Sequence, residues 1–179
     1  MDNLALYGYG IKGFMLSMIE TALRITNNKL DNNILNHIID LGKEMLEKPS
    51  ELLDGVEEVL QQLKGKYKLV VATKGDLLDQ ERKLKKSGIE HYFHHIEIMS
   101  DKQEADFTKL IKHLDITPGE FLMLGNSLKS DVMPVLAIGG HGVHIPYHIT
   151  WEHEKTEHHI DHPQFRQIEN IRQILPGLV

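Results

Sequence analysis

The sequence predicts an α/β fold in which a parallel sheet carries helices on both faces and is preceded by a pair of helices. Two observations support this. From Pro49 onward, short apolar runs alternate with amphipathic segments, as in chains whose parallel strands are joined by helices. Before Pro49, apolar residues recur at helical spacing. We therefore divide the chain into a helical part, residues 1–49, and an α/β core, residues 50–179.

The segment from about Ile11 to Lys48 is expected to form two helices. Polar residues at 27–29 interrupt the helical spacing, and Asp31 follows where it can cap a second helix through its carboxylate. Pro49 and Ser50 end the pair. The apolar positions that carry the helical spacing are Phe14, Met15, Met18, Ile19, Ala22, Leu23, Ile25, Ile34, Leu35, Ile38, Ile39 and Met45.

The core is expected to alternate helices with strands along the chain. Uninterrupted apolar runs indicate buried strands, whereas apolar residues every three or four positions indicate helices. Right-handed crossovers between parallel strands bring all their carboxyl ends to one edge of the sheet. The expected helices are Val56–Leu63, Asp76–Lys86, Phe107–Leu114, Val132–Ile138 and Phe165–Leu175, and the expected strands are Lys68–Thr73, His95–Met99, Phe121–Leu124 and Val143–Pro146.

Composition excludes several classes of function. Of the 179 residues 41% are hydrophobic and 26% charged, as in soluble globular proteins. The net charge of -6 and the lack of a basic patch argue against a nucleic-acid partner. The sequence contains no cysteine, which excludes disulfides, thiolate metal sites and a cysteine nucleophile. It shows no apolar run that would span a membrane and no secretory signal pattern, so we expect a cytoplasmic protein.

The segment from Phe121 to Gly140, FLMLGNSLKSDVMPVLAIGG, is the most informative part of the sequence. An apolar run ends at Gly125, and a polar loop with Asn126 and Asp131 precedes a second apolar run. Such a loop lies at the carboxyl end of a parallel strand, where open α/β sheets place their chemistry. Asn126 and Asp131 supply oxygen atoms, the ligands that suit a hard cation such as Mg²⁺.

Three segments follow one another in a recognisable order. KLVVATKGD ends a strand in Thr73, SDKQEAD places Lys102 after the next strand, and LGNSLKSD follows the strand after that. This order and spacing resembles the haloacid dehalogenase-like (HAD) hydrolase superfamily, whose members are mostly phosphatases. The resemblance covers nearly the whole chain. It implies a three-layer Rossmann-like core, with residues 1–49 forming part of a small helical cap inserted ahead of the Thr73 strand.

The resemblance also implies a function, that of a Mg²⁺-dependent phosphatase acting on a small phosphorylated metabolite. Thr73 would donate its hydroxyl to a phosphate oxygen, and the backbone N–H groups of Lys74 and Gly75 would add to that cradle. Lys102 would neutralise the charge on the phosphate and the nucleophile, since phosphoryl transfer depends on positioning and charge cancellation. The two oxygen-bearing residues of the polar loop would bind Mg²⁺.

One family motif has no counterpart in the sequence. Family members carry an earlier strand ending in Asp-x-Asp, whose first Asp attacks phosphorus and whose second acts as general acid and base. That motif should precede Gly8, yet Asp-x-Asp occurs nowhere in the sequence. We therefore expect a core without its first strand, and little or no phosphatase activity from this polypeptide as it stands.

The family places that strand between the strand that ends in Thr73 and the strand at Phe121–Leu124. Without it, both neighbours would expose unpaired backbone groups. The two strands are therefore expected to pair directly, or to be separated by residues Asn3–Tyr7, or to receive a strand from another chain, as in a homodimer. Two further functions stay open. One is a 2-haloacid dehalogenase-type hydrolase, which needs no metal and suits the neutral Asn126. The other is a non-catalytic HAD-fold binding protein or a truncated gene product.

Two other patterns have simpler interpretations. Gly8 to Gly13 match the dinucleotide pattern G-x-G-x-x-G, but a second helix follows where a strand is required, so we expect a hinge. The C-terminal part is rich in histidine, which can bind transition metals. No carboxylate–histidine spacing supports a zinc site, and we expect an exposed irregular segment at Trp151–His162. These histidines are His141, His144, His148, His153, His158, His159 and His162.

Overall fold

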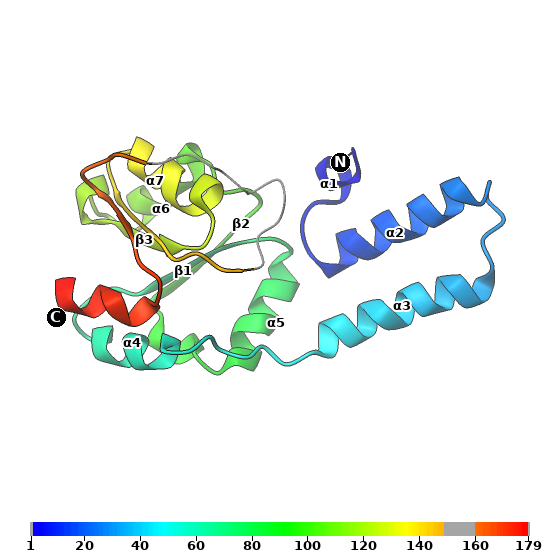
Figure 1. The fold of residues 1–179 in the computed structure, drawn as a ribbon, viewed down its shortest axis with the longest axis horizontal. Helices are drawn as coiled ribbons and strands as arrows, with labels where there is room; N and C mark the ends of the chain where they lie inside the picture. Colours follow the sequence, from blue (N-terminus) through cyan, green and yellow to red (C-terminus); the bar gives the residue numbers. More distant parts are fainter. Residues whose placement is uncertain (1, 149–159, 179) are drawn as a thin grey trace. The chain divides into compact units, whose positions relative to one another are not determined.

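The computed structural model describes residues 2–148 and 160–178 and confirms the α/β class (Figure 1). The chain divides into two compact units. The first comprises Met1–Leu52 and Val71–Ser100, and the second Leu53–Val70 and Asp101–Val179. Within the described ranges no helix is long and apolar enough to cross a membrane. The role of residues 1–49 as a cap stays a prediction.

Three helices open the first unit: α1 (Asp2–Tyr7), α2 (Ile11–Ile25) and α3 (Asn32–Glu47). The second and third pack against each other as a helical hairpin (Figure 1). Asp31 caps α3 as expected, because its carboxylate accepts a hydrogen bond of 2.7 Å from the Asn33 amide. Residues Asn3–Tyr7 lie within a helix. They therefore do not form a strand, which rules out one of the three arrangements that we expected in place of the missing strand.

The rest of the first unit contains β1 (Val70–Lys74), α5 (Leu77–Ser87), the 3₁₀ turn η1 (Glu90–Tyr92) and β2 (His95–Met99). The two strands form a two-stranded sheet. Lys86 joins α5 to the end of α3, where its ammonium group donates to the carbonyl oxygens of Leu46 and Glu47 at 2.8 and 3.1 Å. Carbonyls at a helix C-terminus carry partial negative charge, so the lysine is favourable there.

The second unit has three layers. Its parallel sheet consists of β3 (Leu122–Gly125), β4 (His141–His144) and β5 (Phe165–Gln167), with β4 in the middle. On one face Leu122, Leu124 and Val143 pack with α4 (Val56–Leu63) and the 3₁₀ helix η5 (Ile171–Gly177). On the other lie α6 (Glu104–His113), the 3₁₀ turn η2 (Pro118–Glu120), the π-helical turn η3 (Leu128–Val132) and α7 (Met133–Ala137).

The C-terminal part differs from the sequence-based prediction. The strand expected at Val143–Pro146 is His141–His144, two residues earlier. The single helix expected at Phe165–Leu175 is instead β5 followed by η5. Phe165 to Gln167 are extended because they pair with Gly142 to His144 on the open edge of β4. Sheet pairing has here overridden a local spacing that favoured a helix. Asn170 then caps η5 through a hydrogen bond from the Arg172 amide.

Among the strands that the structure describes, β3 has a partner on one edge only. Its pairing with β4 uses the Phe121 and Gly125 carbonyls, which accept from His141 and Ile145 at 2.9 Å. In a parallel ladder the alternate residues direct their backbone groups to the opposite edge. Among the described residues no strand covers that edge, since β1 belongs to the other sheet. Direct pairing of the β1 and β3 segments, one of the three arrangements that we expected, is therefore not found among the described strands.

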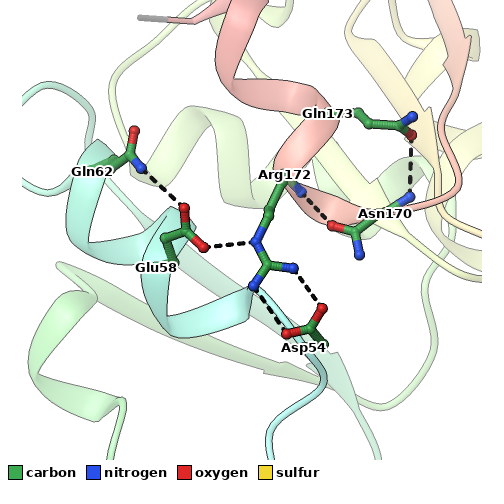
Figure 2. Close-up of polar contacts among 6 residues, drawn as sticks. All are labelled: Asp54, Glu58, Gln62, Asn170, Arg172 and Gln173. Atoms are coloured by element: carbon green, nitrogen blue, oxygen red, sulfur yellow. Dashed lines mark hydrogen bonds and ion pairs between the residues drawn. The ribbon is translucent and has the colours of Figure 1, made fainter.

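An exposed ionic cluster joins α4 to η5 (Figure 2). The Arg172 guanidinium donates to both carboxylate oxygens of Asp54, at 2.5 and 2.9 Å, and to Glu58 at 2.7 Å. These hydrogen bonds hold the pKa of Asp54 below its usual value, and they raise the pKa of Arg172. Gly55 takes a left-handed φ of 82°, and a side chain there would crowd the guanidinium.

Replacing Arg172 by methionine is expected to lower the melting temperature at neutral pH. Because Asp54 has a lowered folded-state pKa, its contribution is present above the unfolded-state pKa, near 4, and is lost as the pH falls through the folded-state value. The two melting temperatures should therefore converge in acid. Thermal unfolding followed by circular dichroism at several pH values measures this. A difference that stays constant down to about pH 2 would mean that the ion pair does not stabilise the fold.

Candidate active site

A buried ion pair lies beyond the carboxyl end of β3. Asp131, in η3, is only 5% exposed, and its Oδ1 accepts from the Lys102 ammonium group at 2.6 Å. Its Oδ2 accepts from the Ser127 backbone amide at 3.1 Å. The side chains of Lys102 and Asp131 are 11% and 7% exposed, so the pair is shielded from water. The lysine precedes α6, and two distant segments of the second unit therefore meet at this point.

Local sequence explains the shape of the loop. Ser127 caps the π-helical turn, since its hydroxyl accepts from the Ser130 amide at 3.0 Å. Gly125 lies directly against Asp131, and a β-carbon at that position would overlap with the aspartate side chain. A glycine is therefore needed where β3 ends. The same residue sets how closely the carboxylate approaches the loop.

Asn126 belongs to the same loop and is exposed. Its backbone carbonyl lies 3.1 Å from Nε2 of His144, at the end of β4. The structure thus places Lys102, Asn126 and Asp131 in one unit, with the lysine and the aspartate in direct contact.

Thr73 lies near the end of β1, in the first unit. Its hydroxyl donates to Gln80 Oε1 at 3.0 Å, and the Lys74 ammonium group stands 4.3 Å from the centre of the Tyr9 ring. The Gly75 amide, expected to contact phosphate, donates to the Met99 carbonyl at 3.2 Å. The phosphate-binding roles of residues 73–75 stay predictions, as does the convergence of Thr73 with the buried pair of the second unit.

Sequence reasoning missed a second charged cluster, which lies within the first unit. Lys12 pairs with Asp76 at 2.7 Å and lies 3.9 Å from Asp79. Asp79 is only 3% exposed, and neither of its carboxylate oxygens accepts a hydrogen bond. The nearby Gly10 has a φ of 112°, and a β-carbon there would lie 3.2 Å from Oδ2 of Asp79. In the sequence, the position of Asp79 in the first turn of the helix was the available signal for this cluster.

The glycines at 8–13 do not form a dinucleotide site. They lie between α1 and α2, and α3 follows, so the strand–helix–strand arrangement that such a site requires is absent around them. Gly8 and Gly10 both have positive φ values. Glycine adopts such angles without strain, and the expected hinge stays a prediction.

The residues at the loop after β3 fit part of a magnesium site. Asp131 is a buried carboxylate, and Asn126, in the same loop, adds a neutral oxygen. In the described part of the chain no group of three or more His, Cys, Asp or Glu side chains could hold a metal ion. Mg²⁺ commonly takes one or two carboxylates and completes its shell with water and phosphate oxygens. The histidines at 153, 158 and 159 lie outside the described residues.

The parallel sheet between two helical layers, with polar groups beyond the end of β3, defines an α/β protein of the Rossmann-like class. The family model described as haloacid dehalogenase-like hydrolase matches residues 2–139. A haloacid dehalogenase-like family hydrolase from Xanthomonas campestris is 36% identical with a TM-score of 0.86, over 98% of this chain and 70% of that chain. The chain belongs to the haloacid dehalogenase-like hydrolases.

More distant solved structures share the fold. A predicted phosphoglycolate phosphatase from Haemophilus somnus is 20% identical with a TM-score of 0.65, over 99% of this chain and 82% of that chain. The 2-haloacid dehalogenase from Pseudomonas syringae is 15% identical with a TM-score of 0.58, over 86% of this chain and 65% of that chain. No curated protein matches the sequence. The fold therefore occurs with both phosphatase and dehalogenase descriptions.

Proposed function

We propose that the protein is a Mg²⁺-dependent phosphatase acting on a small phosphorylated metabolite. The observation that carries the proposal is the buried contact between Lys102 and Asp131 beyond the carboxyl end of β3. Burying two charges is costly, and a pair at this edge of the sheet is more useful to a reaction than to stability. Asn126, in the loop next to it, is exposed.

Each residue has a stated task in this proposal. Lys102 balances negative charge on the transferred phosphoryl group, as a compact ammonium ion can. Asp131 and Asn126 hold the cation, which when bound neutralises charge on the phosphate oxygens. The Ser127 amide keeps Asp131 oriented through its hydrogen bond to Oδ2. Thr73 donates its hydroxyl to the phosphate, with the backbone amide of Lys74 beside it.

The nucleophile comes from a strand that the printed sequence does not contain. We place that strand on the uncovered edge of β3, where Leu122 and Leu124 direct their backbone groups. It would end in Asp-x-Asp and belong either to a segment encoded before Met1 or to another chain of different sequence, because a second copy of these 179 residues contains no Asp-x-Asp. Covering the edge would satisfy backbone groups and deliver two carboxylates beside Lys102.

The polypeptide of 179 residues is expected to hydrolyse p-nitrophenyl phosphate no faster than a blank. It lacks the attacking carboxylate, and residues that act as a unit lose nearly all activity when the nucleophile is removed. The test compares this chain with one extended by the segment encoded in frame before Met1, both assayed with Mg²⁺.

The extended chain should turn over substrate, and Asp131→Ala in that chain should abolish turnover. Metal-dependent turnover by the short chain that is lost in Asp131→Ala would contradict the proposed need for a further strand. The lack of both an upstream Asp-x-Asp and an active extended form would favour the alternative of a non-catalytic binding protein.

One observation favours a second activity, that of a 2-haloacid dehalogenase-type hydrolase. Asn126 is neutral at a position where a metal site would benefit from an acid. Dehalogenation uses a carboxylate nucleophile without a metal. The same extended chain, supplied with 2-chloropropionate in the presence of EDTA, separates the two functions. Chloride release without phosphate release from phosphorylated substrates would establish the dehalogenase.

A further inference from the structure

The site loop receives a hydrogen bond from a histidine that the proposed chemistry does not use. Nε2 of His144 lies 3.1 Å from the backbone carbonyl oxygen of Asn126, and Nδ1 lies 3.1 Å from the side-chain amide of Gln167. His144 ends β4 and Gln167 ends β5. The contact therefore connects the other two strands of the sheet to the loop that follows β3.

The direction of the hydrogen bond to Asn126 follows from chemistry. A carbonyl oxygen can only accept, so Nε2 must carry a proton. The oxygen and nitrogen of the Gln167 amide exchange places when the group turns over. With its NH₂ toward Nδ1, that ring nitrogen accepts the hydrogen bond, and with its oxygen there, Nδ1 donates. In both cases Nε2 of His144 is the donor to the loop.

The acceptor belongs to a peptide group that also contacts the buried pair. The carbonyl of Asn126 and the N–H of Ser127 are the two ends of one planar amide. Its oxygen accepts from His144, and its N–H donates to Oδ2 of Asp131 at 3.1 Å. Hydrogen bonds at the two ends of an amide polarise each other and strengthen together. The other carboxylate oxygen of Asp131, Oδ1, accepts a hydrogen bond from the Lys102 ammonium group.

We propose that His144 is a positioning residue for the reaction: by donating from Nε2 to the Asn126–Ser127 peptide group, it fixes the orientation in which that group holds Asp131 against Lys102. Gln167 in turn orients the imidazole. His144 touches neither of the two charged side chains in the hydrogen bonds described, and it acts through the backbone between them. A role of His144 in catalysis rests on the proposed function. The series of hydrogen bonds from Gln167 through His144 to Asp131 does not depend on that function.

The test uses nuclear magnetic resonance on the intact chain. In the wild type, the long-range ¹H–¹⁵N spectrum of the ring should show a protonated Nε2 at neutral pH. His144→Met removes the donor, and exchange of the Ser127 amide with solvent should become about fivefold faster. His144→Gln keeps an N–H group at similar reach and should restore slow exchange. His141→Met, at the other end of the same strand, is the matched control and should leave exchange unchanged.

Two results would overturn the proposal. One is a wild-type ring protonated only at Nδ1, a result that needs no variant and holds even if His144→Met folds poorly. The other is Ser127 exchange that responds equally in His144→Met, His144→Gln and His141→Met. A titration of the same samples with Mg²⁺ and inorganic phosphate together tests the proposed function separately from the role of His144. Absence of Mg²⁺ binding in the wild type would contradict the metal role in the proposed function and leave the Ser127 result to decide the role of His144.

Discussion

Replacing Lys102 by methionine is expected to lower the free energy of unfolding by about 3 kcal/mol, because it leaves the Asp131 carboxylate buried without a cation. The lysine and the aspartate are 11% and 7% exposed, so solvent cannot take over the role of the ammonium group. The methionine side chain keeps most of the apolar volume. The loss of stability therefore measures the cost of an unpaired buried carboxylate at Asp131 and not the cost of a cavity.

Urea unfolding of wild type and variant measures this difference. Lys109→Met is the matched control, because Lys109 lies on α6, pairs with Asp106 and is 78% exposed. An exposed pair contributes less than about 1 kcal/mol. Asp131→Asn added to Lys102→Met should recover part of the lost stability by removing the unpaired charge. Equal losses in the two lysine variants would show that the buried pair does not exist in solution.

Introducing a β-carbon at the end of β3 is the second change that we expect to lower the free energy of unfolding strongly. Gly125→Ala should lower the free energy of unfolding by about 2 kcal/mol, since the added methyl group would overlap with Asp131 in a tightly packed loop. The aspartate can escape only by giving up its hydrogen bond from Ser127 or its contact with Lys102. Both the stability and the site should therefore change.

Gly119→Ala provides the control for this substitution. Gly119 is also followed closely by a core strand, but a β-carbon there would meet no atom within 4 Å. Chemical denaturation gives the stability change, and amide spectra show whether the signals of Ser127 and Asp131 move. If Gly125→Ala and Gly119→Ala change the stability and the amide spectra alike, Asp131 does not lie as close to the end of β3 as described.

Local patterns predicted much of the fold. The helix at Val56–Leu63 and the strand at His95–Met99 were predicted to the residue, because their apolar spacing agrees with their final surroundings. Residues 165–175 were mispredicted, because their first three residues pair with a strand whose free edge no local pattern reveals. Residues Asn3–Tyr7 form a helix, although a strand was also considered there, because a short apolar patch determines neither a helix nor a strand.

The candidate site was predicted in part. The polar loop after an apolar strand predicted the place of Asn126 and Asp131. It could not show that Lys102 would lie within 2.6 Å of the aspartate, because that contact depends on how α6 packs. The roles of His144 and Asp79 were not predicted, because they too depend on tertiary packing. Their roles depend on partners 18 residues and 67 residues away in the sequence, Asn126 and Lys12.

An amide spectrum recorded during titration with phosphate and Mg²⁺ tests most directly whether Lys102 and Asp131 bind the two ions together. We expect shifts concentrated at Lys102, Ser127 and Asp131, which require both ions and disappear in Asp131→Asn. Shifts that occur elsewhere in the chain, or that persist unchanged in Asp131→Asn, would contradict this joint binding.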